Sequence, residues 1–388
     1  MSLFPPRLFL LFLVAFLVGA DEFLLGPILT PIGHDLGIAP EQVVLFVAAY
    51  SLPLALLAPV FGTLSDHYGR TAILAPAAAV FGLASIATAL SSSFEFGLAS
   101  RLVTGIAGAG MLPIAFAMAA DQGEAQAPKA IALVTSGLTL GIILSPGIGA
   151  WAATLTSWRV AFAGLGVLAL PVALAAFTSG SDAPRQTSTG SRKAEPLLVP
   201  GAVGSLLAMM LGLGGAIGIF ALAGERLREI FGLETGTIGL IYAAFGLATA
   251  AGNFLMPVAV RRLGSGRRVM RLALVCVLAA IVVTYALDGI ALWGVLIALA
   301  VWAVLGGLGA PALQSHIAGL SMARRGALMA LGMSGMNLGV AASSGLAAFA
   351  YAHDARWVAA QGVVLLSLSI VALRPAMATK QETTPVEA

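Results

Sequence analysis

Long apolar runs separated by short polar segments make up most of the sequence. A helix needs about 20 mostly apolar residues to cross a hydrocarbon core of roughly 30 Å. Twelve runs of about that length lie at Leu8–Leu29, Val43–Phe61, Thr71–Leu90, Phe94–Ala120, Ala130–Leu155, Val160–Thr178, Leu198–Ala223, Thr235–Val260, Val269–Leu287, Ala291–Leu313, Gly326–Ala352 and Trp357–Leu373. Strands of a membrane barrel would be about half as long and would alternate polar with apolar residues, which these runs do not. The pattern predicts an all-α membrane protein with twelve transmembrane helices.

The first run differs from a cleaved secretory leader. Arg7 precedes its apolar stretch, as in a signal peptide, but the run is too long and contains Asp21 and Glu22. We therefore expect a retained first span.

The longest polar stretch, Ser179–Pro196, is rich in Ser, Gly, Thr and Pro and is typical of a flexible linker. It predicts a six-helix half at 1–178, a linker at 179–197, a second six-helix half at 198–373 and a short polar tail at 374–388.

An internal repeat supports this division. The pattern S-G-x-x-L-G-x-x-x-S-x-G begins at Ser136 in the fifth run and again at Ser334 in the eleventh, an offset of 198 residues. Repeats of this kind are the sequence signature of transporters built from two parallel halves.

Composition excludes several classes of protein. Only 10% of the residues are charged and the mean hydropathy is +1.00, which excludes an ordinary soluble enzyme and a disordered chain. A net charge of +3 is too small for a nucleic-acid footprint, and the single Cys276 excludes an internal disulfide. The histidines lack metal-ligand spacing, and no phosphate-binding loop or nucleophile–base motif occurs. We therefore expect no enzyme, no metal and no cofactor.

Basic residues indicate the orientation of the chain. If the N-terminus is inside, fifteen of the 20 lie in cytoplasmic segments: Arg7, Arg70, Lys129, Arg185, Arg192, Lys193, Arg261, Arg262, Arg267, Arg268, Arg271, Arg324, Arg325, Arg374 and Lys380. We expect a multi-pass protein of the inner (plasma) membrane with both termini in the cytoplasm.

One loop carries a specific motif. Gly62-Thr-Leu-Ser-Asp66-His-Tyr-Gly69-Arg70 has glycines that suit a tight turn and an acid that can cap a helix or pair with a cation. It resembles the signature G-x-L-x-D-x-x-G-R of the major facilitator superfamily. The resemblance implies a latch between the two halves in the outward-open state, with Asp121 as a possible partner. The corresponding stretch of the second half has Arg261 where Asp66 would fall.

Further motifs extend the resemblance along the chain. Arg101-x-x-x-Gly105 and Trp158-Arg159-x-x-Phe162 resemble family signatures. The stretch around Gly141, Ser145, Pro146 and Gly149 resembles the antiporter signature G-x-x-x-G-P-x-x-G-G, with Ser145 and Ala150 in place of two glycines. Both replacements are small enough for close helix packing. The segment Gly19–Gly37 is similar to the sugar, nucleoside and drug efflux branch, although Asp21 stands where that branch commonly has Thr.

Three charges fall inside predicted spans: Asp21, Glu22 and Arg101. An ionisable group in a span is costly and marks a functional site by default. At about 1.5 Å per residue, the acids and Arg101 reach similar depths, so an acid can pair with Arg101 and release it on protonation. Adjacent helical residues point about 100° apart, so the two acids have different surroundings. We favour Glu22 as the main proton carrier and Asp21 as the second; either acid can instead serve only in helix packing.

Candidates for a substrate cavity are weaker, because packing and interhelical hydrogen bonds also explain them. They are Tyr50, Met111, Phe116, Phe220, Tyr242, Phe245, Asn253 and Asn337. With the resemblance, these features predict a monomeric exporter of a drug, sugar or nucleoside-like molecule that works by proton antiport and alternating access. The alternatives are a facilitator or importer of the same fold and a non-transporting membrane sensor.

Overall fold

The computed structural model describes residues 6–123, 125–179, 199–321 and 324–374, and this part of the chain is helical without strands. Twelve of its helices are long and apolar enough to cross a membrane, which confirms the predicted number of spans. They are Arg7–Leu36, Pro40–Tyr68, Arg70–Ala89, Phe94–Ala120, Ala127–Leu155, Trp158–Thr178, Ala202–Phe220, Thr235–Leu263, Gly266–Tyr285, Leu292–Leu320, Arg325–Tyr351 and Ala355–Ala372. Residues 180–197 of the predicted linker and 375–388 of the predicted tail lie outside the described residues.

Several spans are built from more than one helical element. In the first half these are α1 (Pro6–Phe23), the 3-10 turn η1 (Gly26–Ile28), α2 (Leu29–Leu36), α3 (Pro40–Val43), α4 (Leu45–Tyr68), α5 (Arg70–Ala89), α6 (Phe94–Ala109), α7 (Leu112–Ala120), α8 (Ala127–Leu155) and α9 (Trp158–Thr178). In the second they are α10 (Ala202–Leu207), the π-helical segment η2 (Ala208–Gly214), α11 (Gly215–Phe220), α12 (Ala223–Phe231), α13 (Thr235–Leu263), α14 (Gly266–Tyr285), α15 (Leu292–Leu320), α16 (Arg325–Tyr351) and α17 (Ala355–Ala372).

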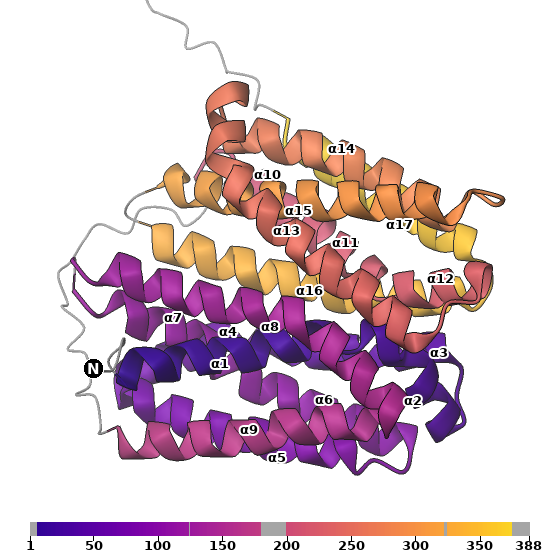
Figure 1. The fold of residues 1–388 in the computed structure, drawn as a ribbon. Helices are drawn as coiled ribbons and strands as arrows, with labels where there is room; N and C mark the ends of the chain where they lie inside the picture. The colour runs from indigo at the N-terminus through magenta and orange to yellow at the C-terminus, as the bar shows by residue number, and fades with distance from the viewer. Residues whose placement is uncertain (1–5, 124, 180–198, 322–323, 375–388) are drawn as a thin grey trace, which may run out of the picture.

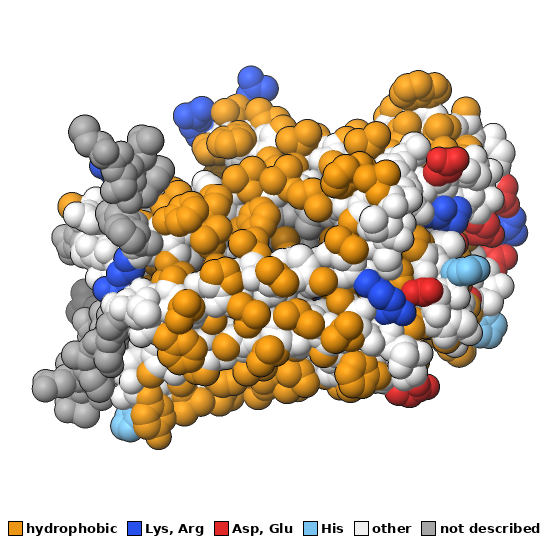
Figure 2. Space-filling view, turned by 60° about the horizontal axis from the view of Figure 1, so that its bottom comes forward, with side chains coloured by type: hydrophobic (Ala, Val, Ile, Leu, Met, Phe, Trp, Pro, Cys, Tyr) orange, Lys and Arg blue, Asp and Glu red, His pale blue; other side chains and the backbone are white. Residues whose placement is uncertain are grey.

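The elements form two adjoining bundles, α1–α9 and α10–α17 (Figure 1). We call the end that holds the start of α1 and the turn between α13 and α14 the terminal face, and the end that holds α2, α3 and α12 the opposite face. A broad band of hydrophobic side chains surrounds the middle of the molecule, and the acidic side chains in view gather toward the opposite face (Figure 2). This distribution is that of a protein whose sides face lipid and whose ends face water.

Small residues allow the helices of the first bundle to pack closely. A Cβ added to Gly141 would collide with the backbone of α1 at Phe16 and Ala20, and one added to Gly149 would meet the side chain of Leu24. Ser145 and Pro146, between these glycines, are buried. The antiporter-like stretch therefore brings α8 against α1, as its small residues predict.

The two bundles meet along α8 with α13 and along α4 with α16. An added Cβ on Gly147 would lie 3.7 Å from the Cβ of Ala243, and one on Gly345 would lie 4.0 Å from Leu45. These contacts occur in the parts of the helices nearer the opposite face. There, α12 also packs against α2 and η1, and α16 against α3.

The seventh span contains the seven-residue π-helical segment η2, which the apolar pattern does not predict. Hydroxyl groups from neighbouring spans bond carbonyls at its two ends. Ser369 Oγ donates to the carbonyl of Ala208 at 3.2 Å, and Ser343 Oγ donates to that of Gly215 at 2.8 Å. These bonds satisfy carbonyls at the ends of η2, where the regular helical ladder is interrupted.

Candidate functional site

A buried ion pair joins α1 to α6. The Arg101 guanidinium donates to both carboxylate oxygens of Asp21, from Nη1 to Oδ1 and from Nη2 to Oδ2, each at 2.7 Å. The exposed fraction of the Asp21 side chain is 0% and that of Arg101 is 1%. The guanidinium also lies 4.8 Å from the ring centre of Tyr50 and 5.5 Å from that of Phe162. Of the two acids in the first span, the structure pairs Asp21 with Arg101.

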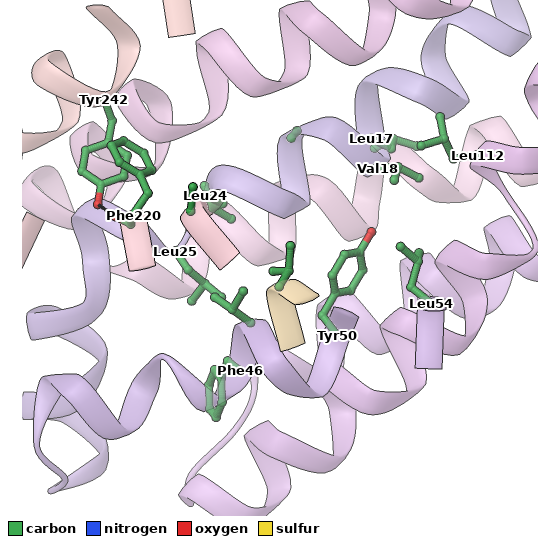
Figure 3. Close-up of a cluster of buried hydrophobic side chains, with 14 of the residues drawn as sticks. Leu17, Val18, Leu24, Leu25, Phe46, Tyr50, Leu54, Leu112, Phe220 and Tyr242 are labelled. Carbon is green, nitrogen blue, oxygen red and sulfur yellow. Dashed lines mark hydrogen bonds between the residues drawn. The ribbon is translucent and has the colours of Figure 1, made fainter. Parts of the chain in front are cut away.

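Close packing of α6 on α4 encloses this pair. A Cβ on Gly105, one turn after Arg101, would collide with the Tyr50 carbonyl oxygen. Tyr50 lies among apolar side chains that include Leu54 (Figure 3). Its buried hydroxyl has no hydrogen-bond partner, and the same is true of Arg101 Nε. The pair thus sits among aromatic rings with two unsatisfied polar atoms beside it.

Glu22 has different surroundings from its neighbour Asp21. Its side chain is half-buried, and no hydrogen bond or ion pair joins it to another described residue. Because an unpaired carboxylate is costly within a membrane span, Glu22 is suited to gain and lose a proton.

The predicted latch residues come together within the first half. Arg70 pairs with Asp66 at 2.7 Å and, through Nε, with Asp121 at 3.3 Å, while its Nη1 donates to Ser65 Oγ. Gly69, at the turn between α4 and α5, has a φ of +100°, which favours glycine, and the space beside Gly62 is open. Asp121 is therefore a partner of Arg70 in this arrangement.

Three of the predicted cavity residues form an aromatic cluster in the second half. The Phe220 ring lies 3.9 Å from that of Phe245 and 4.7 Å from that of Tyr242, and Trp302 and Phe23 border it. Figure 3 shows Phe220 and Tyr242 together.

The other cavity candidates are dispersed. Tyr50 and Met111 are buried in packing, as are Phe220 and Tyr242. Asn337 donates to the carbonyl of Met333 on its own helix. Phe116 and Phe245 are half-buried, and Asn253 is exposed. A shared cavity therefore stays a prediction.

A contact between the halves at the opposite face was not predicted. Thr30 Oγ donates to Glu225 Oε2 at 2.5 Å, and the ring of Tyr242 fills the space beside Gly26. The Tyr242 hydroxyl accepts from the amide of Gly224 and donates to the carbonyl of Phe220, each at 3.0 Å. Burial raises the pKa of Glu225 above its usual value, against the lowering effect of the Thr30 hydrogen bond. The sequence gave no signal for this contact, because Thr30 and Glu225 lie in different halves.

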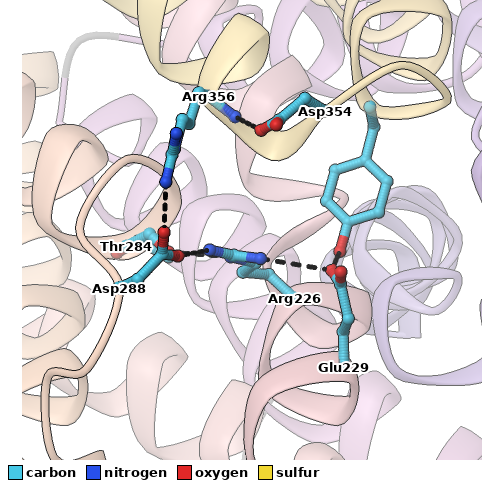
Figure 4. Close-up of polar contacts among 7 residues, drawn as sticks. Arg226, Glu229, Thr284, Asp288, Asp354 and Arg356 are labelled. Atoms are coloured by element: carbon cyan, nitrogen blue, oxygen red, sulfur yellow. Dashed lines mark hydrogen bonds and ion pairs between the residues drawn. The ribbon is translucent and has the colours of Figure 1, made fainter.

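Ion pairs also fasten the elements of each half at the opposite face. Arg226 pairs with Glu229 at 3.3 Å and with Asp288 at 3.1 Å, and Arg356 pairs with Asp288 at 2.5 Å (Figure 4). The hydrogen bond and charge of Arg356 lower the pKa of Asp288.

In the first half, Asp35 accepts from Trp158 Nε1 and pairs with Arg159, each at 3.0 Å. The motif at the start of the sixth span and the end of the first therefore meet, a pairing that their separate positions in the sequence do not show.

Comparisons with known proteins agree on one family. The family model described as Major Facilitator Superfamily matches residues 11–223 and 204–387. The uncharacterized MFS-type transporter YbcL of Bacillus subtilis is 24% identical over 393 residues, which cover 96% of this chain and 98% of YbcL. The uncharacterized MFS-type transporter YtbD of the same organism is 27% identical over 257 residues, and the match spans 64% of each chain.

A relative with a stated role is the quinolone resistance protein NorA of Staphylococcus aureus, 27% identical over 194 residues, half of each chain. Among solved structures, the D-xylose-proton symporter aligns with a TM-score of 0.75 at 16% identity, over 94% of this chain and 96% of the symporter. The human organic anion transporter MFSD10 (TETRAN) aligns with a TM-score of 0.67 at 20% identity, over 96% of this chain and all of that one.

Proposed function

The chain belongs to the Major Facilitator Superfamily, and from this premise we propose that it is a proton-coupled exporter of a small organic molecule. As a member of this family it is a multi-pass transporter of the lipid bilayer and not an enzyme. The proposal adds the direction of transport, the proton and the chemical class of the substrate.

The observation that carries the proposal is the buried Asp21–Arg101 pair beside the unpaired Glu22. Two charges removed from water persist because they neutralise each other, and protonation of Asp21 would end that balance. Glu22 is the acid that the surroundings leave half-accessible, so it exchanges the proton first. Proton uptake in the first span then frees Arg101 and loosens α1 from α6, which couples the proton to the movement of the halves.

The arrangement of the halves supports alternating access. We propose halves at 1–178 and 198–373, joined by the linker 179–197 and followed by the tail 374–388. The terminal face is cytoplasmic, because basic residues collect there, so both termini lie on the cytoplasmic side of the inner membrane. The halves meet near the opposite, outer face, and the latch residues Asp66, Arg70 and Asp121 bond within one half. This is the arrangement of an inward-facing state, in which the latch does not join the halves.

The similarity to NorA supports a drug-like substrate and export. The aromatic cluster of Phe220, Tyr242 and Phe245 supplies an apolar surface for such a molecule, and Asn253 supplies a polar contact. We propose a monomer whose partners are this substrate, protons and lipid, without a nucleic acid.

The test is transport in proteoliposomes with an imposed pH gradient and a fluorescent quinolone as the probe. We expect quinolone flux to follow the gradient, and Glu22→Gln to abolish that dependence. Glu95→Gln, which changes an exposed acid at the start of α6, is the matched control and should transport as the wild type does. Flux that ignores the gradient in both proteins would contradict proton coupling. Uptake in the reverse direction would indicate an importer, and no flux of quinolones, sugars or nucleosides would favour a sensor.

A further inference from the structure

The charges on the terminal face are distributed unequally between the two halves. In the first half, the described residues of this face include Arg7, Arg70 and Lys129, together with Asp66 and Asp121. In the second half, all described acids lie at the opposite face: Glu225, Glu229, Glu234, Asp288 and Asp354. The arginines on the terminal face of the second half thus have no carboxylate beside them among the described residues.

Five of these arginines lie within eleven residues, at the corner where α13 turns into α14. We call this group the arginine corner: Arg261, Arg262, Arg267, Arg268 and Arg271. No ion pair reaches any of the five among the described residues, and Arg271 Nε is buried without a hydrogen-bond partner. The equivalent corner of the first half is neutralised instead, because Arg70 pairs there with Asp66 and Asp121.

The backbone of the arginine corner is well fixed. Gly264 ends α13 with a φ of +79°, and Ser265 begins α14 by accepting the amide of Arg268. A Cβ on Gly266 would collide with the Ala312 carbonyl oxygen, so the turn is packed against α15. Arg268 Nη1 also donates to the carbonyl of Leu263. The guanidinium groups therefore project from a rigid turn.

The exposed arginines continue the lipid-facing stripes of both helices. On α13, Phe254 and Val258 are exposed, with fractions of 84% and 38%, and Arg261 follows at helical spacing on the same face. On α14, Arg268 precedes Leu272 and Val275, which are 49% and 52% exposed, on one face. Apolar stripes of this kind contact acyl chains, so the arginines at their ends lie at the depth of the lipid headgroups.

We propose that the arginine corner binds the phosphate of an anionic phospholipid in the membrane leaflet on this side. Guanidinium groups donate in pairs to phosphate oxygens, and basic pockets beside membrane spans bind acidic headgroups. The excess of basic residues inside the cell explains why arginines occur on this face, but not why one half has paired charges and the other unpaired ones. The assignment of this leaflet as cytoplasmic rests on the proposed topology; the lipid binding does not.

The test is lipid binding by the full chain in detergent, measured by native mass spectrometry with phosphatidylglycerol and with phosphatidylcholine. We expect preferential binding of phosphatidylglycerol by the wild type. Each basic residue near a charged headgroup strengthens binding about fivefold, so the variant Arg261→Gln/Arg262→Gln/Arg268→Gln should bind it about a hundredfold more weakly. The same three changes to Lys should retain most of the affinity, which shows that the Gln variant loses charge and not its fold.

The control variant Lys129→Gln/Arg325→Gln/Arg374→Gln removes the same net charge elsewhere on the terminal face. It should bind phosphatidylglycerol within about threefold of the wild type. An equal loss in the control, equal binding of both lipids, or full displacement by millimolar inorganic phosphate would each overturn the proposal; the last would indicate a site for a free anion. None of these measurements depends on transport, so they remain informative if the exporter proposal fails.

Discussion

Asp21 and Glu22 are adjacent acids with different expected effects on stability. Asp21→Asn leaves the Arg101 charge buried without its partner, and breaking a buried pair in this way costs about 3–5 kcal/mol. We expect a clear fall in the thermal unfolding midpoint of the purified protein. Glu22→Gln should change that midpoint little, because Glu22 has no partner among the described residues.

The double variant Asp21→Asn/Arg101→Gln is the control, since it removes both charges. It should recover part of the stability that Asp21→Asn loses. An Asp21→Asn protein as stable as the wild type would show that the pair is not intact in the resting protein.

Glu225 gives the outer contact a dependence on pH. Its pKa is raised in the closed arrangement, chiefly by burial, with Glu41 and Glu229 adding to the rise and Thr30 and Arg228 opposing it. A group with a raised pKa binds its proton more tightly when closed, so closure is favoured at a pH below the ordinary value and weakened as the pH rises through the raised one. We expect acid outside to favour the closed outer face and Glu225→Gln to remove this dependence.

The measurement is the distance between spin labels on Thr237 and Ala153, which flank this face, over a range of external pH. Asp288→Asn is the comparison, because the pKa of Asp288 is lowered and its effect has the opposite sign. A pH response that persists in Glu225→Gln would contradict the assignment.

The sequence predicted much of the residue-scale site but could not choose between the two acids. Depth along the helices showed that an acid could reach Arg101, and the 100° turn per residue showed that only one acid would. Which of them faces Arg101 depends on how α1 is rotated about its axis. That rotation is set by backbone contact of Gly141 with α1, which no single span reveals.

At the scale of elements, η2 provides a test of how membrane helices tolerate irregular backbone. Ser343 and Ser369 bond carbonyls at its two ends. Replacing either with Ala leaves a carbonyl unsatisfied, at a cost of about 1 kcal/mol each. We expect Ser343→Ala/Ser369→Ala to lower the thermal unfolding midpoint.

Ser136→Ala is the matched control, because the Ser136 hydroxyl bonds only the carbonyl of Ala132 on its own helix and is exposed. It should leave the midpoint almost unchanged. Equal effects from the two sets of changes would show that the hydroxyl groups do not support η2.

Other elements show where hydropathy is informative. The fourth span was predicted to extend from Phe94 to Ala120, and the structure has these ends. The first span continues beyond the predicted Leu29 to Leu36, because the helix extends past the apolar run. The helix α12 was not predicted, since its polar sequence lacks a membrane-length apolar run. Hydropathy locates the segments buried in lipid, whereas helices at the membrane surface depend on tertiary contacts.

At the scale of the whole molecule, the repeat in the fifth and eleventh spans predicted two related halves, but not how they meet. The contacts of Gly147 with Ala243 and of Gly345 with Leu45 are made between halves far apart in sequence. Alternating access requires such contacts to form and break, so one sequence encodes several arrangements of the halves. Motifs can therefore identify the family and the latch, while the conformational state comes only from the structure.

The contact between Gly147 and Ala243 allows the proposed movement to be tested directly. Their Cβ positions lie 3.7 Å apart, within the range of a disulfide, and Cys276 is the chain's single cysteine. We expect Gly147→Cys/Ala243→Cys, in a Cys276→Ser background, to form a disulfide on oxidation. The bond should hold the outer side closed, so transport in proteoliposomes should fall to background and return after reduction.

The single variants Gly147→Cys and Ala243→Cys, treated with the same oxidant, separate the bond from the effect of either substitution, and both should retain transport. Quinolone binding should persist in the oxidised double variant, because a closed outer side leaves the inward-facing site intact. Oxidised protein with a complete disulfide and undiminished transport would mean that α8 and α13 never separate there. The halves would then have to move about this contact as a fixed hinge instead of opening across it.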